Sequence, residues 1–321
     1  MKKSVVVVGS LNMDIAVAVA RLPAEGETLQ GGGLAEAPGG KGANQAAAIG
    51  KLQTPVCLIG KVGADRNGDA LLQSLAESGV DTGAVLTSSG QPTGIALVTV
   101  DREGRNHIVV VPGANGELSS DDIDSRIGML EQCEIVVLQL EVPLETVAYT
   151  LSKAKALGKT TVLNPAPAVR LDDELLRHVD FLIPNERELR TIAGLDDVGG
   201  PSIERAARLF AEKGVGALIV TMGEKGCYYA DRSTVKAYPA LQVNAVDTTA
   251  AGDSFIGGFV AGYLASRDAD AAIREAQIAA AITVTRHGAQ SSLPTRREVE
   301  SFRRSLNEYE QFRSRRGEDE A

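Results

Sequence analysis

The sequence predicts an α/β fold in which a doubly wound, mainly parallel sheet carries helices on both faces and a small antiparallel β lid is attached. Three observations predict this fold. Short apolar runs of strand length recur, helical patterns lie between most of them, and two stretches of neighbouring strands interrupt the alternation. Hydrophobic residues make up 44% of the 321 residues and aromatic residues only 4%, which suits aliphatic strands buried on both faces.

The core strands are predicted from runs that are bounded by turn residues. They are VVVVG at 5–9, VCLIG at 56–60, IVVLQL at 135–140, TTVLN at 160–164, FLIP at 181–184 and ALIVTMG at 217–223. Helical patterns between them include ANQAAAIGKL at 43–52, DALLQSLAESG at 69–79 and IERAARLFAEKG at 203–214, and the last two end at a glycine. Strands that alternate with helices in this way predict a parallel sheet.

The lid is predicted where strands follow one another without a helix. The run DIAVAVA at 14–20 is one such strand, and the runs at 93–101 and 105–113 are joined by a short turn. We expect lid strands from about 14–36 and 93–112, inserted into one domain that spans residues 1–310. The polar residues 311–321 are expected to form a disordered tail.

The charge and the cysteines limit the classes of function. A net charge of −9 and a pI near 5.1 disfavour nucleic acid and anionic membranes as partners. Three cysteines without a CxxC spacing suggest neither disulfides nor a zinc site. The start MKKSVVVVGS is interpreted as a buried strand and not as a signal peptide, and no apolar run reaches membrane-span length. We therefore expect a cytoplasmic protein.

The stretch DTTAAGDSF at 247–255 places small residues directly before a predicted helix at 253–265. Helix N-termini carry free N–H groups and a partial positive charge, so this loop is a candidate anion site. Asp253 would lie in the first helical turn. It is either an acid that compensates the helix dipole or a base held beside a bound anion.

Several motifs together resemble the ribokinase family of carbohydrate kinases. They are GSLNMD at 9–14, GGKGANQAAA at 39–48, NPAPA at 164–168, PNERE at 184–188, DTTAAGDSF at 247–255 and RHGAQSS at 286–292. The resemblance spans about residues 4–310. It implies phosphoryl transfer from MgATP to the 5-hydroxyl of D-ribose, with Asp253 as the base and the amides of Ala250, Ala251, Gly252 and Asp253 as an anion hole. No P-loop is present, because Ala35 and Gly42 occupy positions where that motif needs Gly and Ser or Thr.

The resemblance also implies a set of sugar-binding residues. By spacing alone, Asn12 and Asp14 could form an Asx turn at a strand end or could face one ligand together. Glu141 follows the strand IVVLQL, at the strand end where open α/β sheets bind ligands. The sugar-binding residues implied by the resemblance are Asn12, Asp14, Gly39, Gly40, Lys41, Asn44, Glu141 and Asp253.

The nucleotide side of the expected site contains a motif with two interpretations. Asn185 and Glu188 have the spacing of a capping box, and the resemblance assigns this motif to magnesium and phosphate. The implied cofactor-binding residues are Asn185, Glu188, Thr221, Gly223, Gly226, Ala251, Gly252 and Gln277. Gln277 departs from the His or Asn that is usual in the family at the adenine.

A monovalent cation, K⁺, is implied by a further set of residues. Its expected oxygen ligands are Asp247, Thr249, Thr283, Arg286, Gly288 and Ser292, with Arg286 contributing its carbonyl and not its guanidinium. Such a cation would order the loop before the predicted helix.

Other functions remain open at this point. A kinase of the same fold could act on deoxyribose, a hexose or a nucleoside, and a catalytically silent sugar-binding protein belongs to another class. A dinucleotide-dependent dehydrogenase is disfavoured, because no GxGxxG follows the first strand. The resemblance and the free edges of the lid strands predict a homodimer through the lid.

Overall fold

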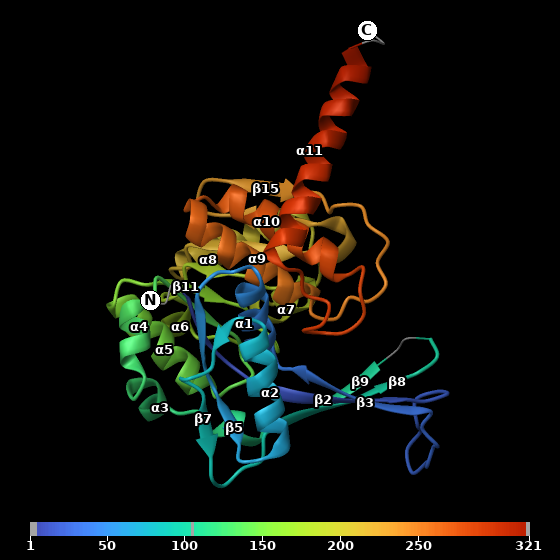
Figure 1. The fold of residues 1–321 in the computed structure, drawn as a ribbon. Coiled ribbons are helices and arrows are strands. Elements are labelled where there is room, and N and C mark those ends of the chain that lie inside the picture. The colour runs from blue at the N-terminus through green and yellow to red at the C-terminus, as the bar shows by residue number, and fades with distance from the viewer. Residues whose placement is uncertain (1–4, 104–105, 319–321) are drawn as a thin grey trace.

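The computed structural model describes residues 5–103 and 106–318. Within them, a nine-stranded sheet lies between two layers of helices (Figure 1). Its strand order is β15 (Val235–Tyr238), β14 (Cys227–Ala230), β13 (Ala217–Thr221), β12 (Phe181–Leu182), β11 (Thr160–Leu163), β10 (Ile135–Leu138), β1 (Val5–Val8), β4 (Val56–Ile59) and β6 (Val80–Asp81). The pairings from β13 to β6 are parallel, and the edge hairpin β14–β15, which the sequence did not predict, pairs antiparallel.

Strand β1 shows why these strands are apolar throughout. Val5 and Val7 face one hydrophobic core, whereas Val6 and Val8 face a second core on the other side of the sheet. All four side chains are 0% exposed. The two cores confirm the predicted burial of the sheet on both faces.

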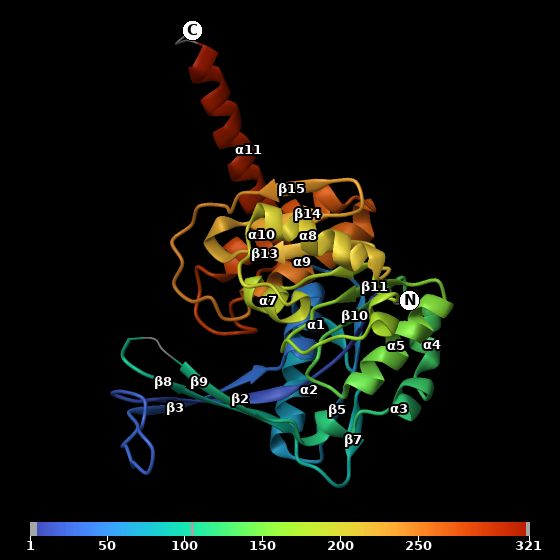
Figure 2. The ribbon, with the colours of Figure 1, turned by 180° about the vertical axis from the view of Figure 1, so that it is seen from behind.

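The helices are divided between these two cores. Those of the first core are α1 (Lys41–Lys51), α2 (Arg66–Glu77), α9 (Ala251–Ser266) and α10 (Ala269–Thr283). Those of the second are α3 (Ser120–Asp124), α4 (Ile127–Gln132), α5 (Leu144–Ala156), α6 (Asp173–Leu176), α7 (Glu186–Ala193) and α8 (Gly200–Glu212). Figure 2 shows the second group from behind.

The strand order reverses at β1. This strand pairs with β4, the next core strand in the chain, on one side and with β10 on the other. In open α/β sheets such a reversal opens a crevice beyond the carboxyl ends of the two central strands. The segments that follow β1 and β10 therefore border the expected ligand site.

The lid is a four-stranded sheet of β3 (Gly33–Gly39), β2 (Asn12–Ala18), β8 (Gly94–Val100) and β9 (Asn106–Val111). Figures 1 and 2 show it projecting from the body beside α2. The outer pairings are antiparallel as predicted, but β2 and β8 pair in parallel. A parallel pairing is possible because the chain passes through α1, β4 and α2 between these two strands.

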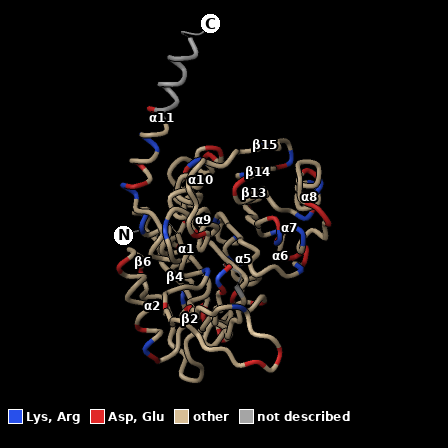
Figure 3. Tube along the Cα trace, turned by 90° about the vertical axis from the view of Figure 1, so that its right-hand side faces the viewer, with Lys and Arg blue, Asp and Glu red and all other residues tan. Residues whose placement is uncertain are grey.

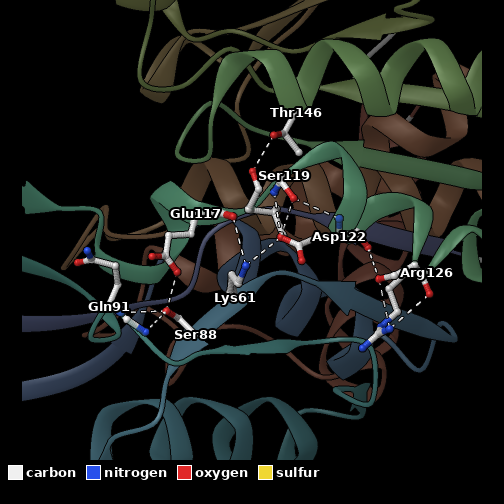
Figure 4. Close-up of polar contacts among 11 residues, drawn as sticks. Lys61, Ser88, Gln91, Glu117, Ser119, Asp122, Arg126 and Thr146 are labelled. Atoms are coloured by element: carbon white, nitrogen blue, oxygen red, sulfur yellow. Dashed lines mark hydrogen bonds and ion pairs between the residues drawn. The ribbon is translucent and has the colours of Figure 1, made fainter.

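A polar cluster anchors both ends of the β8–β9 hairpin (Figure 4). Ser88, at the end of β7 (Leu86–Ser88), donates a 2.5 Å hydrogen bond to Glu117, which ends the 3₁₀ helix η1 (Gly113–Glu117) after β9. Lys61, in β5 (Lys61–Gly63), forms a 3.0 Å ion pair with Asp122 of α3. The base of the lid is therefore tied to the body.

The last helix, α11 (Arg296–Glu318), extends away from the body (Figure 1). Its start is fixed by buried Val299 and by ion pairs from Arg296 and Arg303 to Glu275 of α10. The helix continues to Glu318, and the disorder expected for residues 311–321 stays a prediction. Residues 319–321 of that expected tail lie outside the described residues.

Charged positions of both signs are intermixed along the trace (Figure 3). Among the described helices, none combines the length and the apolar character needed to cross a membrane.

Candidate active site

Asp253 lies in the first turn of α9, as the sequence predicted. The helix begins after Ala250, whose φ of 58° is left-handed, so the chain turns sharply into the helix. The Asp253 side chain is only 8% exposed. An acid that merely compensates the dipole at a surface helix start would be solvated, so its burial disfavours that interpretation.

Two amide side chains of α1 hold the Asp253 carboxylate. Asn44 Nδ2 donates to Oδ2 at 3.1 Å, and Gln45 Nε2 donates to Oδ1 at 3.0 Å. Helix α1 can approach α9 this closely because of Gly257, where an added Cβ would lie 2.4 Å from the Cβ of Ala48. The Ala- and Gly-rich composition of α9 thus serves helix contact.

Burial raises the pKa of Asp253, and Lys41, Gln45 and Asn44 act in the opposite direction. Burial also raises the pKa of Asp14 to about 6, with further contributions from Glu141 and Asp253. The carboxylates therefore share one poorly solvated region around a single ammonium group, that of Lys41. Burial lowers the pKa of Lys41, but the surrounding carboxylates outweigh it and raise this pKa above its usual value.

A cavity of about 210 Å³ lies in front of Asp253. Eight of the predicted site residues line it, namely Lys41, Asn185, Glu188, Thr221, Ala250, Ala251, Gly252 and Asp253. These residues come from the starts of α1, α7 and α9 and from the end of β13. The structure thus joins residues that are more than 200 positions apart in the sequence.

The predicted sugar-binding residues lie beside the lid base. Asn12 is 3% exposed, and its Oδ1 accepts a 2.8 Å hydrogen bond from Asn115 Nδ2. Glu141 Oε2 accepts from Ser10 Oγ at 2.5 Å and from the Lys41 backbone N–H at 3.0 Å. Glu141 therefore connects the ends of β1 and β10 to the start of α1.

Two glycines bring the lid close to the start of α1. A Cβ at Gly39 would lie 2.3 Å from the carboxylate of Asp14, and Gly40 has a φ of 88°. The backbone after β3 can therefore pass directly over Asp14 and enter the helix.

Asn185 and Glu188 form a complete capping box at the start of α7. Glu188 N–H donates to Asn185 Oδ1 at 2.9 Å, and Asn185 N–H donates to Glu188 Oε2 at 2.8 Å. The same carboxylate borders the cavity, and burial raises its pKa. Capping and ligand binding are therefore compatible for this motif.

Three predicted nucleotide residues lie outside the residues that line this cavity. Gly223 and Gly226, with φ of 57° and 100°, form the turn between β13 and β14. Gln277 donates to the carbonyls of Tyr238 and Pro239 at 3.3 and 2.7 Å. Its amide thus already binds the segment after β15.

The predicted cation residues come from two loops and the end of α10, which the structure joins. Asp247 Oδ2 accepts from the Gly288 N–H at 2.9 Å, and its Oδ1 accepts from Thr249 Oγ1 at 2.7 Å. Thr283 Oγ1 donates to Ser254 of α9 at 2.7 Å. Ser292, whose Oγ donates to the Ala289 carbonyl at 2.7 Å, is 0% exposed.

The Arg286 guanidinium is engaged by Glu298 at 2.6 Å, so only the backbone of Arg286 is available to a cation. The described residues contain no set of three or more His, Cys, Asp or Glu side chains arranged for metal binding. Any cation in these loops would depend on carbonyl and hydroxyl oxygens, the ligands expected for K⁺.

Sequence reasoning did not single out several polar residues of the site. Gln45 and Asn164 bond to each other at 3.2 Å behind Asp253, and Gln139 and Asn115 complete the buried contacts. The sequence could have indicated Gln139, since it is a polar residue within the apolar run IVVLQL. No pattern in the sequence indicates Asn115, because an Asn in a loop is usually a turn residue.

The chain is similar to curated sugar kinases over nearly its whole length. A ribokinase of Haemophilus influenzae is 40% identical over 302 residues, covering 94% of this chain and 99% of that protein. A deoxyribokinase of Salmonella typhi is 41% identical over 307 residues, covering 95% and 99%. The two relatives differ in the sugar that their names give.

Solved structures have the same fold. Arabidopsis thaliana ribokinase complexed with ribose and ATP gives a TM-score of 0.87 at 32% identity, covering 94% of this chain and 99% of that chain. A putative ribokinase II from E. coli in complex with ATP and Mg²⁺ gives 0.78 at 25% identity, with the same coverage. The family model for the pfkB family carbohydrate kinases matches residues 2–296. This chain therefore belongs to the pfkB family of carbohydrate kinases.

Proposed function

We propose that this chain is an ATP-dependent kinase that phosphorylates the 5-hydroxyl of D-ribose, giving D-ribose 5-phosphate and ADP. The observation that carries the proposal is the buried Asp253 carboxylate, which faces the cavity from the first turn of α9. Lys41 and the Asn185–Glu188 motif border the same cavity. The site thus combines a base, a cation and phosphate-binding amides.

Asp253 is the proposed general base. It takes the proton of the 5-hydroxyl while the sugar oxygen forms a bond to the γ-phosphorus of ATP, and the bond between that phosphorus and the β,γ-bridging oxygen breaks. ADP leaves with that bond's electrons. The hydrogen bonds from Asn44 and Gln45 hold the carboxylate in one orientation, and Lys41 favours its ionised form.

The start of α9 is the proposed anion hole. The amides of Ala250, Ala251, Gly252 and Asp253 lie at the turn where the helix N-terminus meets the cavity. The N–H groups at this helix start and the helix dipole stabilise negative charge on the transferred phosphoryl group, although the Ala251 N–H also donates to the Thr248 carbonyl at 3.2 Å. The left-handed turn at Ala250 lets the chain enter the helix without a bulky side chain in front of these amides.

We assign the sugar to Asn12, Asp14, Asn44 and Glu141, with Gly39 and Gly40 giving it room. The nucleotide is assigned to Thr221, Gly223, Gly226 and Gln277, at the end of β13, in the turn after it and within α10. Ribose and ATP in the related plant enzyme support this class of ligands.

Magnesium fits the Asn185–Glu188 motif through water. Both oxygens of Glu188 already accept hydrogen bonds from Asn185, at 2.8 Å each. The carboxylate can still attract hydrated Mg²⁺, which prefers to keep several of its waters. Bound there with ATP, Mg²⁺ would neutralise charge on the phosphates.

A monovalent cation, K⁺, is assigned to Asp247, Thr249, Thr283, Arg286, Gly288 and Ser292. The hydrogen bond from Thr283 to Ser254 links these loops to the residue after Asp253. We expect K⁺ to raise kcat by ordering the start of α9. Equal rates in K⁺ and in a bulky organic cation would contradict this assignment.

We also propose a homodimer through the lid. The partner is a second copy, because β3 and β9 are edge strands and the lid exposes apolar side chains, including Leu34 at 69%, Ile108 at 55% and Val109 at 61%. Such edges and patches on a folded chain are usually covered by another subunit.

The choice of sugar is tested by an ATP-dependent assay on ribose, deoxyribose, fructose and a nucleoside. Ribose should give the highest kcat/KM. A preference for deoxyribose is the second candidate, because a deoxyribokinase is 41% identical to this chain. Absence of phosphorylation with all of these sugars would favour a silent sugar-binding protein.

A further inference from the structure

A chain of buried amide side chains lies behind Asp253. The NH₂ group of Gln45 donates to Asp253 Oδ1 at 3.0 Å and to Asn164 Oδ1 at 3.2 Å. The Oε1 of Gln45 accepts a 2.6 Å hydrogen bond from Gln139 Nε2. Gln45 and Gln139 are both 0% exposed. Both hydrogens and the oxygen of the Gln45 amide are therefore engaged.

The Gln139 amide is unfavourable for the stability of the fold. Its Oε1 is buried and has no hydrogen-bond partner within the described part of the chain. A buried polar atom without a partner destabilises a fold, and such atoms are rare. At Gly9, an added Cβ would lie 2.1 Å from this oxygen, so the adjoining end of β1 leaves the room that Gln139 occupies.

The orientation of Gln139 determines the orientation of Gln45. Turning Gln139 alone would bring its oxygen against the oxygen of Gln45. Turning both amides would direct the oxygen of Gln45 at the carboxylate of Asp253. We propose that Gln139 is a positioning residue, which fixes the Gln45 amide so that its N–H groups face Asp253 and Asn164.

This role, which rests on the proposed kinase activity, concerns the ionised form of the base. A fixed N–H donor stabilises the carboxylate but cannot accept a hydrogen bond from the protonated acid. If Gln45 could turn, its oxygen would accept the proton of Asp253 and stabilise the protonated acid.

The other charged groups that act on Asp253 are Lys41, which favours the ionised form, and Glu141, Asp14 and Glu188, which disfavour it. They remain in place when Gln139 is changed. The effect of Gln139 can therefore be measured against a constant background.

The test is Gln139→Met, which keeps the length of the side chain and removes the amide. The acid limb of the kcat profile should move to higher pH by about half a unit to one unit, which is what one buried hydrogen bond contributes. At pH values below the wild-type pKa, kcat of the variant should be about three- to tenfold lower than that of the wild type. On the alkaline plateau, kcat and the sugar KM should stay near the wild-type values. Gln139→Leu is a second variant if the first folds poorly.

A double variant separates positioning from packing. Because Gln139 acts through Gln45, Gln139→Met should have no further effect on the acid limb in a Gln45→Met background. Thr150→Val is the matched control, since it removes another 0% exposed polar group, on α5, and should leave the limb unmoved. Additive effects of the two glutamine changes, or an unmoved limb in Gln139→Met, would overturn the proposal.

A titration of Asp253 by carboxyl ¹³C NMR gives a readout that needs no turnover. Its pKa should rise in Gln139→Met by the same half unit to one unit. If the wild type phosphorylates a sugar but the pKa of Asp253 is the same in Gln139→Met as in the wild type, only the positioning role is contradicted. A wild type that phosphorylates no sugar contradicts the proposed function, whereas the titration still decides the role of Gln139.

Discussion

Replacing Asp253 by Asn tests the centre of the proposed mechanism. The substitution keeps the size of the side chain and removes its ability to accept the sugar proton. Asn44 and Gln45 now donate to the carboxylate at 3.1 and 3.0 Å. In the variant, one of these donors must face the new NH₂ group, so one hydrogen bond is lost as well.

The magnitudes of the two effects differ. Loss of one hydrogen bond costs about 0.5–1.5 kcal/mol, which is at most about a tenfold change in rate or affinity. Loss of a general base lowers kcat by about 10² to 10⁴, or about 3 to 5 kcal/mol of barrier. We therefore expect kcat to fall at least a hundredfold while the Kd for the sugar changes by less than about tenfold.

The assay measures ADP formation with saturating MgATP and sugar, and calorimetry measures sugar binding. Asp69→Asn is the matched control, because Asp69 also lies in a first helical turn but is exposed. It should leave kcat unchanged. A kcat of the Asp253→Asn enzyme within about threefold of wild type would refute the role of Asp253 as base.

Three further predictions concern the cap, the acid cluster and the lid. Glu188→Ala should lower the free energy of unfolding in urea by about 1 kcal/mol and raise the Mg²⁺ concentration needed for half-maximal rate, because it removes both the cap and a charge at the cavity. Glu188→Gln, which can still cap, should change only the Mg²⁺ requirement; an unchanged requirement would reduce the motif to a cap. Folding raises the pKa of Asp14 from 3.8 to about 6, so the stability that this group contributes is present below pH 4 and is lost as the pH rises through 6. The difference in the free energy of unfolding between Asp14→Asn and the wild type should therefore be more favourable to the variant above pH 6 than at pH 4, by at most about 3 kcal/mol. A difference that does not change with pH in urea denaturation would contradict this. Val109→Lys should raise the dimer Kd at least about tenfold in sedimentation, while Val235→Lys, outside the lid, should not.

Much of the fold is predictable from local patterns. The valines of β1 and the aliphatic runs of the other core strands indicate burial on both faces, because parallel strands covered by helices on both faces are apolar at consecutive positions. The helix that starts at Ala251 is predicted from small residues followed by an apolar segment. The hairpin β14–β15 is not predicted, because Cys227–Ala230 is an apolar run of only four residues, and the edge strand Val235–Tyr238 is interrupted by Lys236 and exposed at three of its four positions.

The motifs also indicate most of the cavity lining, since a small-residue loop before a helix and an Asn-x-x-Glu cap are local features. Their relation in space is not local. Asn44 and Asp253 are hydrogen-bonded although 209 positions separate them, and no periodicity predicts such a contact.

The sequence by itself determined the layered α/β fold, the helix that carries Asp253 and the chemical groups available to the site, because strand burial and helix starts depend on neighbouring residues. Only the tertiary structure decided which donors hold the carboxylate, that Gln139 orients Gln45, and that β2 pairs in parallel with β8. These contacts join segments far apart in the chain, so they depend on how the whole sheet and its helices pack, which no local pattern encodes.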